Sequence, residues 1–129
     1  MILILGGMSA GKRTYARSLG YTDEEMAPFL PSSSGYADDT APVAYDVQAA
    51  VWADPAHAEA LLPRLLTKQV VIINEVGSGV IPADEQERLA REQTGRLTVL
   101  LAAQATRVVR IVCGIPVVLK ETEEACSSI

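Results

Sequence analysis

A glycine-rich segment near the start of the chain has the composition of a phosphate-binding loop. Its residues are Gly6, Gly7, Met8, Ser9, Ala10, Gly11 and Lys12, in the spacing G-x-x-x-x-G-K. Small residues let backbone N–H groups turn toward phosphate oxygens, and the lysine adds a mobile ammonium. An apolar run over residues 2–5 precedes the segment, and a stretch without helix breakers over residues 12–19 follows it. A strand, a loop and a helix in this order predict a site for the phosphates of ATP or GTP.

The position after Lys12 departs from the usual motif, which has a serine or threonine there as a magnesium ligand. This chain has Arg13, whose guanidinium cannot coordinate a cation. Thr14 follows, but one further residue turns a helical side chain by about 100 degrees, toward an α-phosphate rather than the metal position. Arg13 is interpreted either as a solvated helix residue or as a cation that replaces the metal charge. Both residues belong to the predicted nucleotide site, and the use of Mg²⁺ stays an open question.

A second candidate segment follows the apolar run over residues 70–73. It reads Asn74-Glu75-Val76-Gly77-Ser78-Gly79-Val80-Ile81-Pro82. If the strand before it neighbours the first strand, Glu75 lies beside the phosphate-binding loop. A carboxylate there can hold Mg²⁺ through water or orient a nucleophile, and the alternative is a tight glycine turn with an exposed glutamate. Lys12 and Glu75 are the predicted catalytic residues, and Glu75 and Thr14 are the candidate metal ligands.

The two segments together resemble those of the adenosylcobinamide kinase/adenosylcobinamide-phosphate guanylyltransferase family of cobalamin biosynthesis. The second segment is similar to the family signature N-E-V-G-x-G-[IV]-[IV]-P. Further matching residues follow it: Gly95-Arg96, Leu101-Ala102-Ala103, Arg107-Val108-Val109, Val112-Cys113-Gly114-Ile115 and Leu119-Lys120. The resemblance implies that ATP or GTP phosphorylates the aminopropanol hydroxyl of adenosylcobinamide. It also implies a second step, in which GMP is transferred to the product through a guanylylated histidine.

Three features depart from the family pattern. The family has its histidine after the first helix, and then a further strand-helix unit with an acidic residue before the N-E-V-G strand, and this region is much shorter here. The only histidine, His57, does not match the family context, so we interpret it as a surface histidine rather than a guanylyl acceptor. Thr98 stands where the family usually has asparagine. We therefore expect that the guanylyltransferase step is lost.

Alternating apolar and helical segments predict an α/β fold, a P-loop NTPase-like three-layer sandwich with a small, mainly parallel sheet. The expected strands cover residues 2–5, 70–73, 107–113 and 117–120. The expected helices cover residues 12–19, 43–52, 56–66 and about 83–105. On the last helix one apolar face is expected, formed by Leu89, Leu97, Leu100, Leu101 and Gln104.

Residues 21–42 are rich in turn formers, with one helical turn expected near residues 23–26. A loop of this length is either a lid over the site or a disordered segment. We expect a single P-loop nucleotide-binding domain over residues 1–120, followed by a polar C-terminal tail over residues 121–129.

Composition excludes several classes of partner. The net charge of −5 argues against nucleic acid. The apolar start of the chain ends at Gly6, too early for a signal peptide or a membrane span, so a cytoplasmic protein with no membrane partner is expected. Cys113 lies in an apolar run that predicts a core position, while Cys126 lies in the polar tail, so no disulfide framework is expected. A small sheet with exposed edges favours a homo-oligomer.

Three functions stay open on the sequence alone. The leading hypothesis is a kinase that binds ATP or GTP and a cobinamide-like alcohol, a corrinoid small molecule. The second is a nucleotide-binding regulatory or assembly module without catalysis, which Arg13 favours. The third is a doubly wound domain whose loop binds only inorganic phosphate or sulfate.

Overall fold

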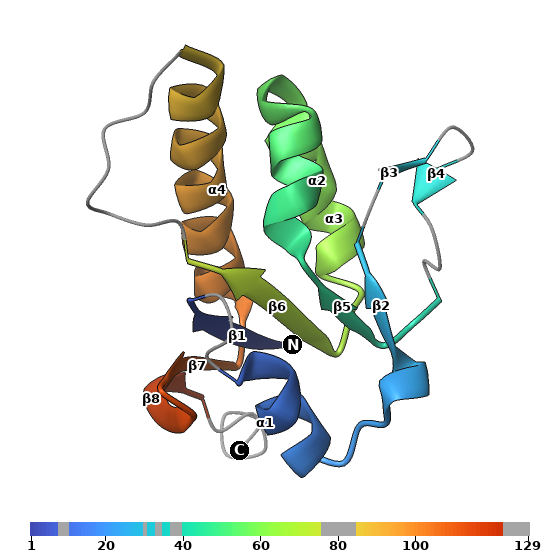
Figure 1. Ribbon diagram of the computed structural model, residues 1–129, viewed down its shortest axis with the longest axis vertical. Helices are drawn as coiled ribbons and strands as arrows, with labels where there is room; N and C mark the ends of the chain where they lie inside the picture. The colour runs from blue at the N-terminus through green and yellow to red at the C-terminus, as the bar shows by residue number, and fades with distance from the viewer. Residues whose placement is uncertain (8–10, 30, 33–34, 37–39, 76–84, 123–129) are drawn as a thin grey trace, which may run out of the picture.

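The computed structural model describes residues 1–7, 11–29, 31–32, 35–36, 40–75 and 85–122. Its main feature is a six-stranded sheet with the order β2-β5-β6-β1-β7-β8 (Figure 1). The strands are β1 (Ile2–Gly6), β2 (Met26–Pro28), β5 (Val43–Tyr45), β6 (Val70–Asn74), β7 (Arg107–Val112) and β8 (Ile115–Glu121). All neighbours pair in parallel except β8, which is antiparallel to β7. The predicted mainly parallel α/β fold is confirmed.

Helices cover both faces of this sheet. The helix α1 (Lys12–Ser18) packs on one face, and α2 (Val47–Ala53), α3 (Leu62–Leu65) and α4 (Glu85–Gln104) stand on the other (Figure 1). Two short 3₁₀ helices, η1 (Asp23–Glu25) and η2 (Pro55–Leu61), complete the helical elements. The turn expected near residues 23–26 is therefore present as η1. A separate antiparallel pair is formed by β3 (Pro31–Ser32) and β4 (Gly35–Tyr36).

The core lies on both sides of β1 and β6, because these strands are continuous runs of branched apolar residues. Toward α2, α3 and α4 the sheet buries Leu3, Leu5, Val71, Ile73 and Val108. Toward α1 it buries Ile4, Val70, Ile72, Val109 and Ile111. Full burial of one such side chain stabilises the fold by about 1.5–3 kcal/mol. The two central strands therefore form the rigid base from which the loop after β1 and the segment after β6 extend.

The residues before α2 correct a prediction, because residues 43–45 form the strand β5 and not the start of a helix. Val43 and Ala44 are buried and pair in parallel with Val70 and Val71 of β6. Alanine-rich sequence favours a helix locally, but here the sheet decides, because the strand buries both faces. The expected helix over residues 56–66 is also shorter, since η2 and the single turn of α3 take its place.

The buried face of α4 differs in part from the predicted one. Its buried residues are Ala90, Thr94, Leu97 and Leu101. Leu97 and Leu101 were predicted, whereas Leu100 is 37% exposed and Gln104 is also exposed. The observed buried residues are separated by four, three and four positions, which follows the helical period of 3.6 residues better than the predicted set.

The prediction that Cys113 is a core residue was wrong. Cys113 is an exposed free thiol in the turn between β7 and β8, with a positive φ of 50°. The apolar run continues through this turn because β8 is an edge strand whose apolar side chains are exposed, so hydropathy there does not report burial. Cys126 lies outside the described residues. Within the described residues, no helix is both long enough and apolar enough to cross a bilayer.

Candidate functional site

The glycine-rich loop leaves the sheet at the carboxyl end of its central strand. Gly6 is the last residue of β1, and Gly11 immediately precedes α1. Gly11 has φ 97°, and a Cβ there would lie 3.5 Å from the Cα of Gly114. The distance is an ordinary van der Waals contact, so a side chain at this position would strain the backbone through the positive φ and not through crowding. Met8, Ser9 and Ala10 lie outside the described residues, so their predicted phosphate contacts stay a prediction.

Lys12 turns back over the loop that it follows. Its side chain is almost fully buried, at 6% exposure, and its Nζ donates a hydrogen bond to the carbonyl oxygen of Gly7 at 2.5 Å. Burial lowers the pKa of the Lys12 ammonium, and the carboxylates of Asp46 and Glu75 act in the opposite direction. A buried ammonium bonded to a neutral carbonyl gains from exchanging this partner for a phosphate oxygen.

Arg13 and Thr14 are both exposed on α1. The guanidinium carbon of Arg13 lies 4.7 Å from the centroid of the Tyr45 ring, a cation–π contact. Tyr45 ends β5, so this contact holds Arg13 against the carboxyl edge of the sheet. Of the two interpretations of Arg13, the replacement of metal charge requires a position at this edge, which the contact provides.

Glu75 lies beside the loop, because β6 is the direct neighbour of β1. Asn74 is in register with Gly6, and the N–H of Glu75 donates to the Gly6 carbonyl oxygen at 2.8 Å. The glutamate side chain is 33% exposed. The structure therefore brings the predicted pair Lys12 and Glu75 to one edge of the sheet.

Arg110 is a site residue that the sequence analysis missed. Its Nε lies 2.9 Å from Oε1 of Glu75 and its Nη2 donates to Oε2 at 3.0 Å, so the pair is bidentate. Arg110 is on β7, in register with Leu5 of β1. The one available signal was a charged residue inside the apolar run over residues 107–112, which a buried strand does not tolerate without a partner.

Asp46 is a second residue that the analysis missed. It lies between β5 and α2 with a positive φ of 55°. Of the two carboxylates that oppose the lowering of the Lys12 pKa by burial, Asp46 has the larger effect. Gln48 on α2 accepts a hydrogen bond from the Asn74 N–H at 3.0 Å, which ties this corner to the end of β6. The shortened region before the Asn74–Glu75 strand still contains a strand-helix unit with an acidic residue, formed by β5, Asp46 and α2.

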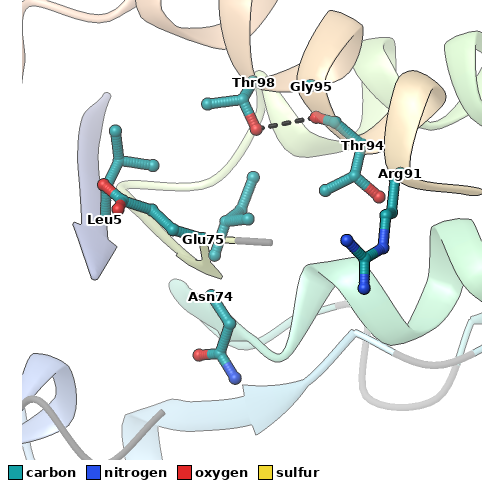
Figure 2. Close-up of a pocket in the computed structure, with 8 residues that line it drawn as sticks. Leu5, Asn74, Glu75, Arg91, Thr94, Gly95 and Thr98 are labelled. Atoms are coloured by element: carbon teal, nitrogen blue, oxygen red, sulfur yellow. Dashed lines mark hydrogen bonds between the residues drawn. The ribbon is translucent and has the colours of Figure 1, made fainter. Parts of the chain in front are cut away.

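A cavity of about 350 Å³ opens next to Glu75, between the ends of β1 and β6 and the helix α4 (Figure 2). Its lining consists of Leu5, Ile73, Asn74, Glu75, Arg91, Thr94, Gly95 and Thr98. Leu5 and Ile73 of the two strands form an apolar floor of the cavity, and polar residues surround this floor. The hydroxyls of Thr94 and Thr98 donate to helix carbonyls at 2.7 and 2.8 Å, which leaves their oxygens available as acceptors. The cavity suits a small ligand with hydroxyl groups.

His57 lies apart from this edge. It is in η2, after α2, which rises away from the sheet for about 10 Å over its seven residues (Figure 1). Its side chain is 76% exposed and its Nδ1 lies 2.9 Å from Oδ2 of Asp54. The surface position expected for His57 is observed.

Comparison with known proteins identifies relatives of this chain. The sequence model of the cobinamide kinase / cobinamide phosphate guanyltransferase family matches residues 37–119. The bifunctional adenosylcobalamin biosynthesis protein CobU of Escherichia coli (strain K12) is 36% identical over 88 residues, which are 66% of this chain and 49% of that protein. The chain thus spans about half the length of this curated relative. The family match includes Asp46, Glu75, Arg110 and the helix α4, while the loop over residues 6–12 precedes it.

Proposed function

This chain belongs to the cobinamide kinase / cobinamide phosphate guanyltransferase family, and we propose that it binds ATP or GTP and phosphorylates a cobinamide-like alcohol in cobalamin biosynthesis. The observation that carries this proposal is the position of Glu75. This residue lines the cavity and also lies beside the loop that ends in Lys12, so one carboxylate borders both a phosphate site and a site for an alcohol.

The nucleotide is assigned to the loop between β1 and α1. The ammonium of Lys12 exchanges the Gly7 carbonyl for oxygens of the β- and γ-phosphates, because a charged acceptor binds an ammonium more strongly than a neutral one. The terminal phosphate then points toward the end of β6, where Glu75 and the cavity lie.

The acceptor arm is assigned to the cavity beside α4. Its hydroxyl oxygen attacks the γ-phosphorus, the bond from this phosphorus to the β–γ bridging oxygen breaks, and a nucleoside diphosphate leaves. The hydroxyl proton passes to water. Glu75 orients the hydroxyl by accepting a hydrogen bond, and Lys12 stabilises the charge on the transferred group, since positioning and charge stabilisation provide most of the catalysis in such reactions.

The guanylyltransferase step has no acceptor group in this proposal. A guanylyl-accepting imidazole must reach the α-phosphorus in line, and His57 follows the end of α2 that points away from the sheet. We propose that His57 is a surface residue and that the reaction ends with the phosphorylated alcohol.

A direct experiment measures the release of nucleoside diphosphate (ADP or GDP) with adenosylcobinamide and with buffer alone, and detects the phosphorylated corrinoid by mass spectrometry. We expect release that depends on the corrinoid and is lost in Lys12→Ala. The variant Arg17→Gln is the matched control, because it removes an exposed ion-paired arginine from the same helix at a site away from the loop. Binding of nucleotide without any phosphorylated product would contradict the kinase proposal.

That outcome would support the second candidate, a nucleotide-binding module without catalysis. A specific observation favours it, namely that both carboxylate oxygens of Glu75 are engaged by Arg110. An orienting role for Glu75 uses the remaining lone pairs of these oxygens, whereas a purely structural role does not. The variant Glu75→Gln separates the orienting role from the structural role of Glu75, because it lowers turnover only if the carboxylate acts on the acceptor hydroxyl.

A further inference from the structure

A magnesium ion at a phosphate-binding loop needs oxygen ligands that are available to it. Arg13 stands at the usual hydroxyl position, and Thr14 is exposed one residue further along α1. Both oxygens of Glu75 are held by Arg110. Within the described part of the chain, no three carboxylate, histidine or cysteine side chains gather closely enough to hold a metal. Among the described residues at this edge, Asp46 is the one carboxylate left without an ion pair, and a single carboxylate with no hydroxyl at position 13 does not fit a magnesium site of the usual kind.

The same edge of the sheet carries two guanidinium groups. Arg110 is fixed by the strand β7 on one side of β1, and its partner Glu75 follows β6 on the other side. The ion pair therefore spans β1 at the point where the chain leaves the sheet for the loop. A guanidinium has five N–H donors, and the two bonds to Glu75 leave three for other acceptors. Arg110 is also 52% exposed, so these donors are accessible to a ligand.

Arg13 is placed on the opposite flank of the loop. Its contact with the Tyr45 ring holds it at the end of β5, next in sequence to Asp46. An arginine thus lies at each of the two strand ends that carry an acidic residue. Arg13 contacts Tyr45, next to Asp46, and Arg110 is ion-paired with Glu75. Both carboxylates oppose the lowering of the Lys12 pKa by burial, so both act electrostatically on the Lys12 ammonium.

We propose that Arg110 and Arg13 are the counter-charges of the phosphate site and that nucleoside triphosphate binds here without a divalent cation. Arg110 neutralises Glu75, which would otherwise repel the phosphates or require a metal ion as a bridge. Its remaining donors then face the phosphate oxygens, as guanidinium groups do in bidentate phosphate contacts. This inference rests on the proposed nucleotide binding and specifies its metal requirement.

The test titrates the purified chain with GTP and with ATP by calorimetry, in buffer with EDTA and in buffer with excess Mg²⁺. For the parent chain we expect affinities that agree within about threefold between the two buffers. Arg110→Gln releases the Glu75 carboxylate, so its affinity falls at least about tenfold in EDTA and recovers when Mg²⁺ is added. Arg13→Ser restores a hydroxyl ligand and also makes the affinity rise with Mg²⁺.

Three further variants keep the test specific. Arg110→Lys retains the charge but not the bidentate geometry and is expected to lie between the parent and Arg110→Gln. Arg17→Gln removes another ion-paired arginine, 42% exposed against 52% for Arg110, and is expected to bind like the parent in both buffers. The double variant Arg110→Gln, Glu75→Gln removes the Glu75 carboxylate together with its partner, so the response to Mg²⁺ that Arg110→Gln creates is expected to disappear again. Thermal unfolding of every variant verifies the fold.

The outcomes separate this inference from the function on which it rests. Nucleotide binding that requires Mg²⁺ in the parent chain would overturn metal independence and leave the proposed function intact. An Arg110→Gln variant that binds like the parent in both buffers would overturn the role of Arg110. Absence of nucleotide binding in both buffers would overturn the proposed function and this inference together.

Discussion

Asp46 and Glu75 occupy equivalent places in the fold and are held in different ways. Each follows a buried strand of the parallel sheet, β5 and β6, and each carboxylate raises the pKa of Lys12 against the effect of burial. Glu75 directly follows the last residue of β6 and has a bidentate arginine. Asp46 has a left-handed backbone and, within the described residues, one long contact of 3.5 Å from the Gln48 amide.

The difference shows that the end of a strand fixes where a carboxylate lies but does not decide which group offsets its charge. Glu75 is held by Arg110 of β7, so its negative charge is offset by a direct ion pair. Asp46 is held by the backbone turn that connects β5 to α2, so its charge acts on Lys12 without such an offset. Within the described residues, one carboxylate beside this ammonium is therefore ion-paired and the other is not, and the following predictions test that distinction.

The largest expected effect removes the group that both carboxylates share. Lys12→Ala is expected to lower nucleotide affinity more than tenfold, because a charge-assisted phosphate contact contributes about 1.5–3 kcal/mol. The fold is expected to survive, since the truncated side chain belongs to the site and leaves the apolar core intact. Calorimetric titration with GTP and ATP measures the loss, with Arg17→Gln as the control. Unchanged affinity would remove the phosphate-loop assignment.

The next effect separates the two carboxylates through pH. Nucleotide binding is expected to weaken at alkaline pH before an ordinary lysine titrates, because burial lowers the pKa of Lys12. Asp46→Asn is expected to move the midpoint of this loss to lower pH by more than Glu75→Gln does, since Arg110 already offsets Glu75. Affinity measured as a function of pH gives both midpoints. Equal shifts, or a larger one for Glu75→Gln, would contradict the distinction.

The lowered pKa of Lys12 also makes the stability of the ligand-free protein depend on pH. Between the lowered pKa of Lys12 and the ordinary lysine value, the unfolded chain binds more protons than the folded one, so the free energy of unfolding rises with pH in this window. Asp46→Asn widens the window at its lower end, because it removes the larger opposing charge. Urea unfolding at several alkaline pH values measures this slope.

A smaller effect concerns the backbone that holds Asp46. A non-glycine residue at φ 55° is strained, although aspartate tolerates this region better than most residues. Asp46→Ala is expected to be less stable than Asp46→Gly by about 1 kcal/mol, because only glycine adopts this conformation without a Cβ clash. Urea unfolding of the two variants, which both lack the carboxylate, isolates the backbone term. An Ala variant as stable as the Gly variant would show that the turn relaxes.

The smallest expected effect lies outside this pair, at the exposed carboxylate–histidine contact of Asp54 and His57. Incubation with GTP is expected to give no covalent GMP adduct, and His57→Ala is expected to bind nucleotide like the parent chain. Intact-protein mass spectrometry decides this point. A stoichiometric GMP-sized mass increase that disappears in His57→Ala would show that the transferase step is present.

Local sequence determined the central strands and the turn into α1, because a single physical requirement dominates at each of these places. Continuous runs of branched apolar residues specify β1 and β6, because only a strand covered on both faces buries them completely. The glycine spacing before Lys12 predicts the turn from β1 into α1, and the observed positive φ of Gly11 shows why a glycine is needed there. The position of Glu75 at the end of β6 also follows from the sequence once the two strands are neighbours.

Only the tertiary structure decided the partners of these residues. The strand β5 could not be predicted from three residues before an alanine-rich helix, because its stability comes from pairing with β6 and β2. Arg110 contacts Glu75 across an intervening strand and 35 positions of sequence. Such a contact depends on strand order and register, which no local pattern contains. The chemistry at this edge of the sheet therefore depends on how the strands are arranged, since their order sets which charge neutralises which.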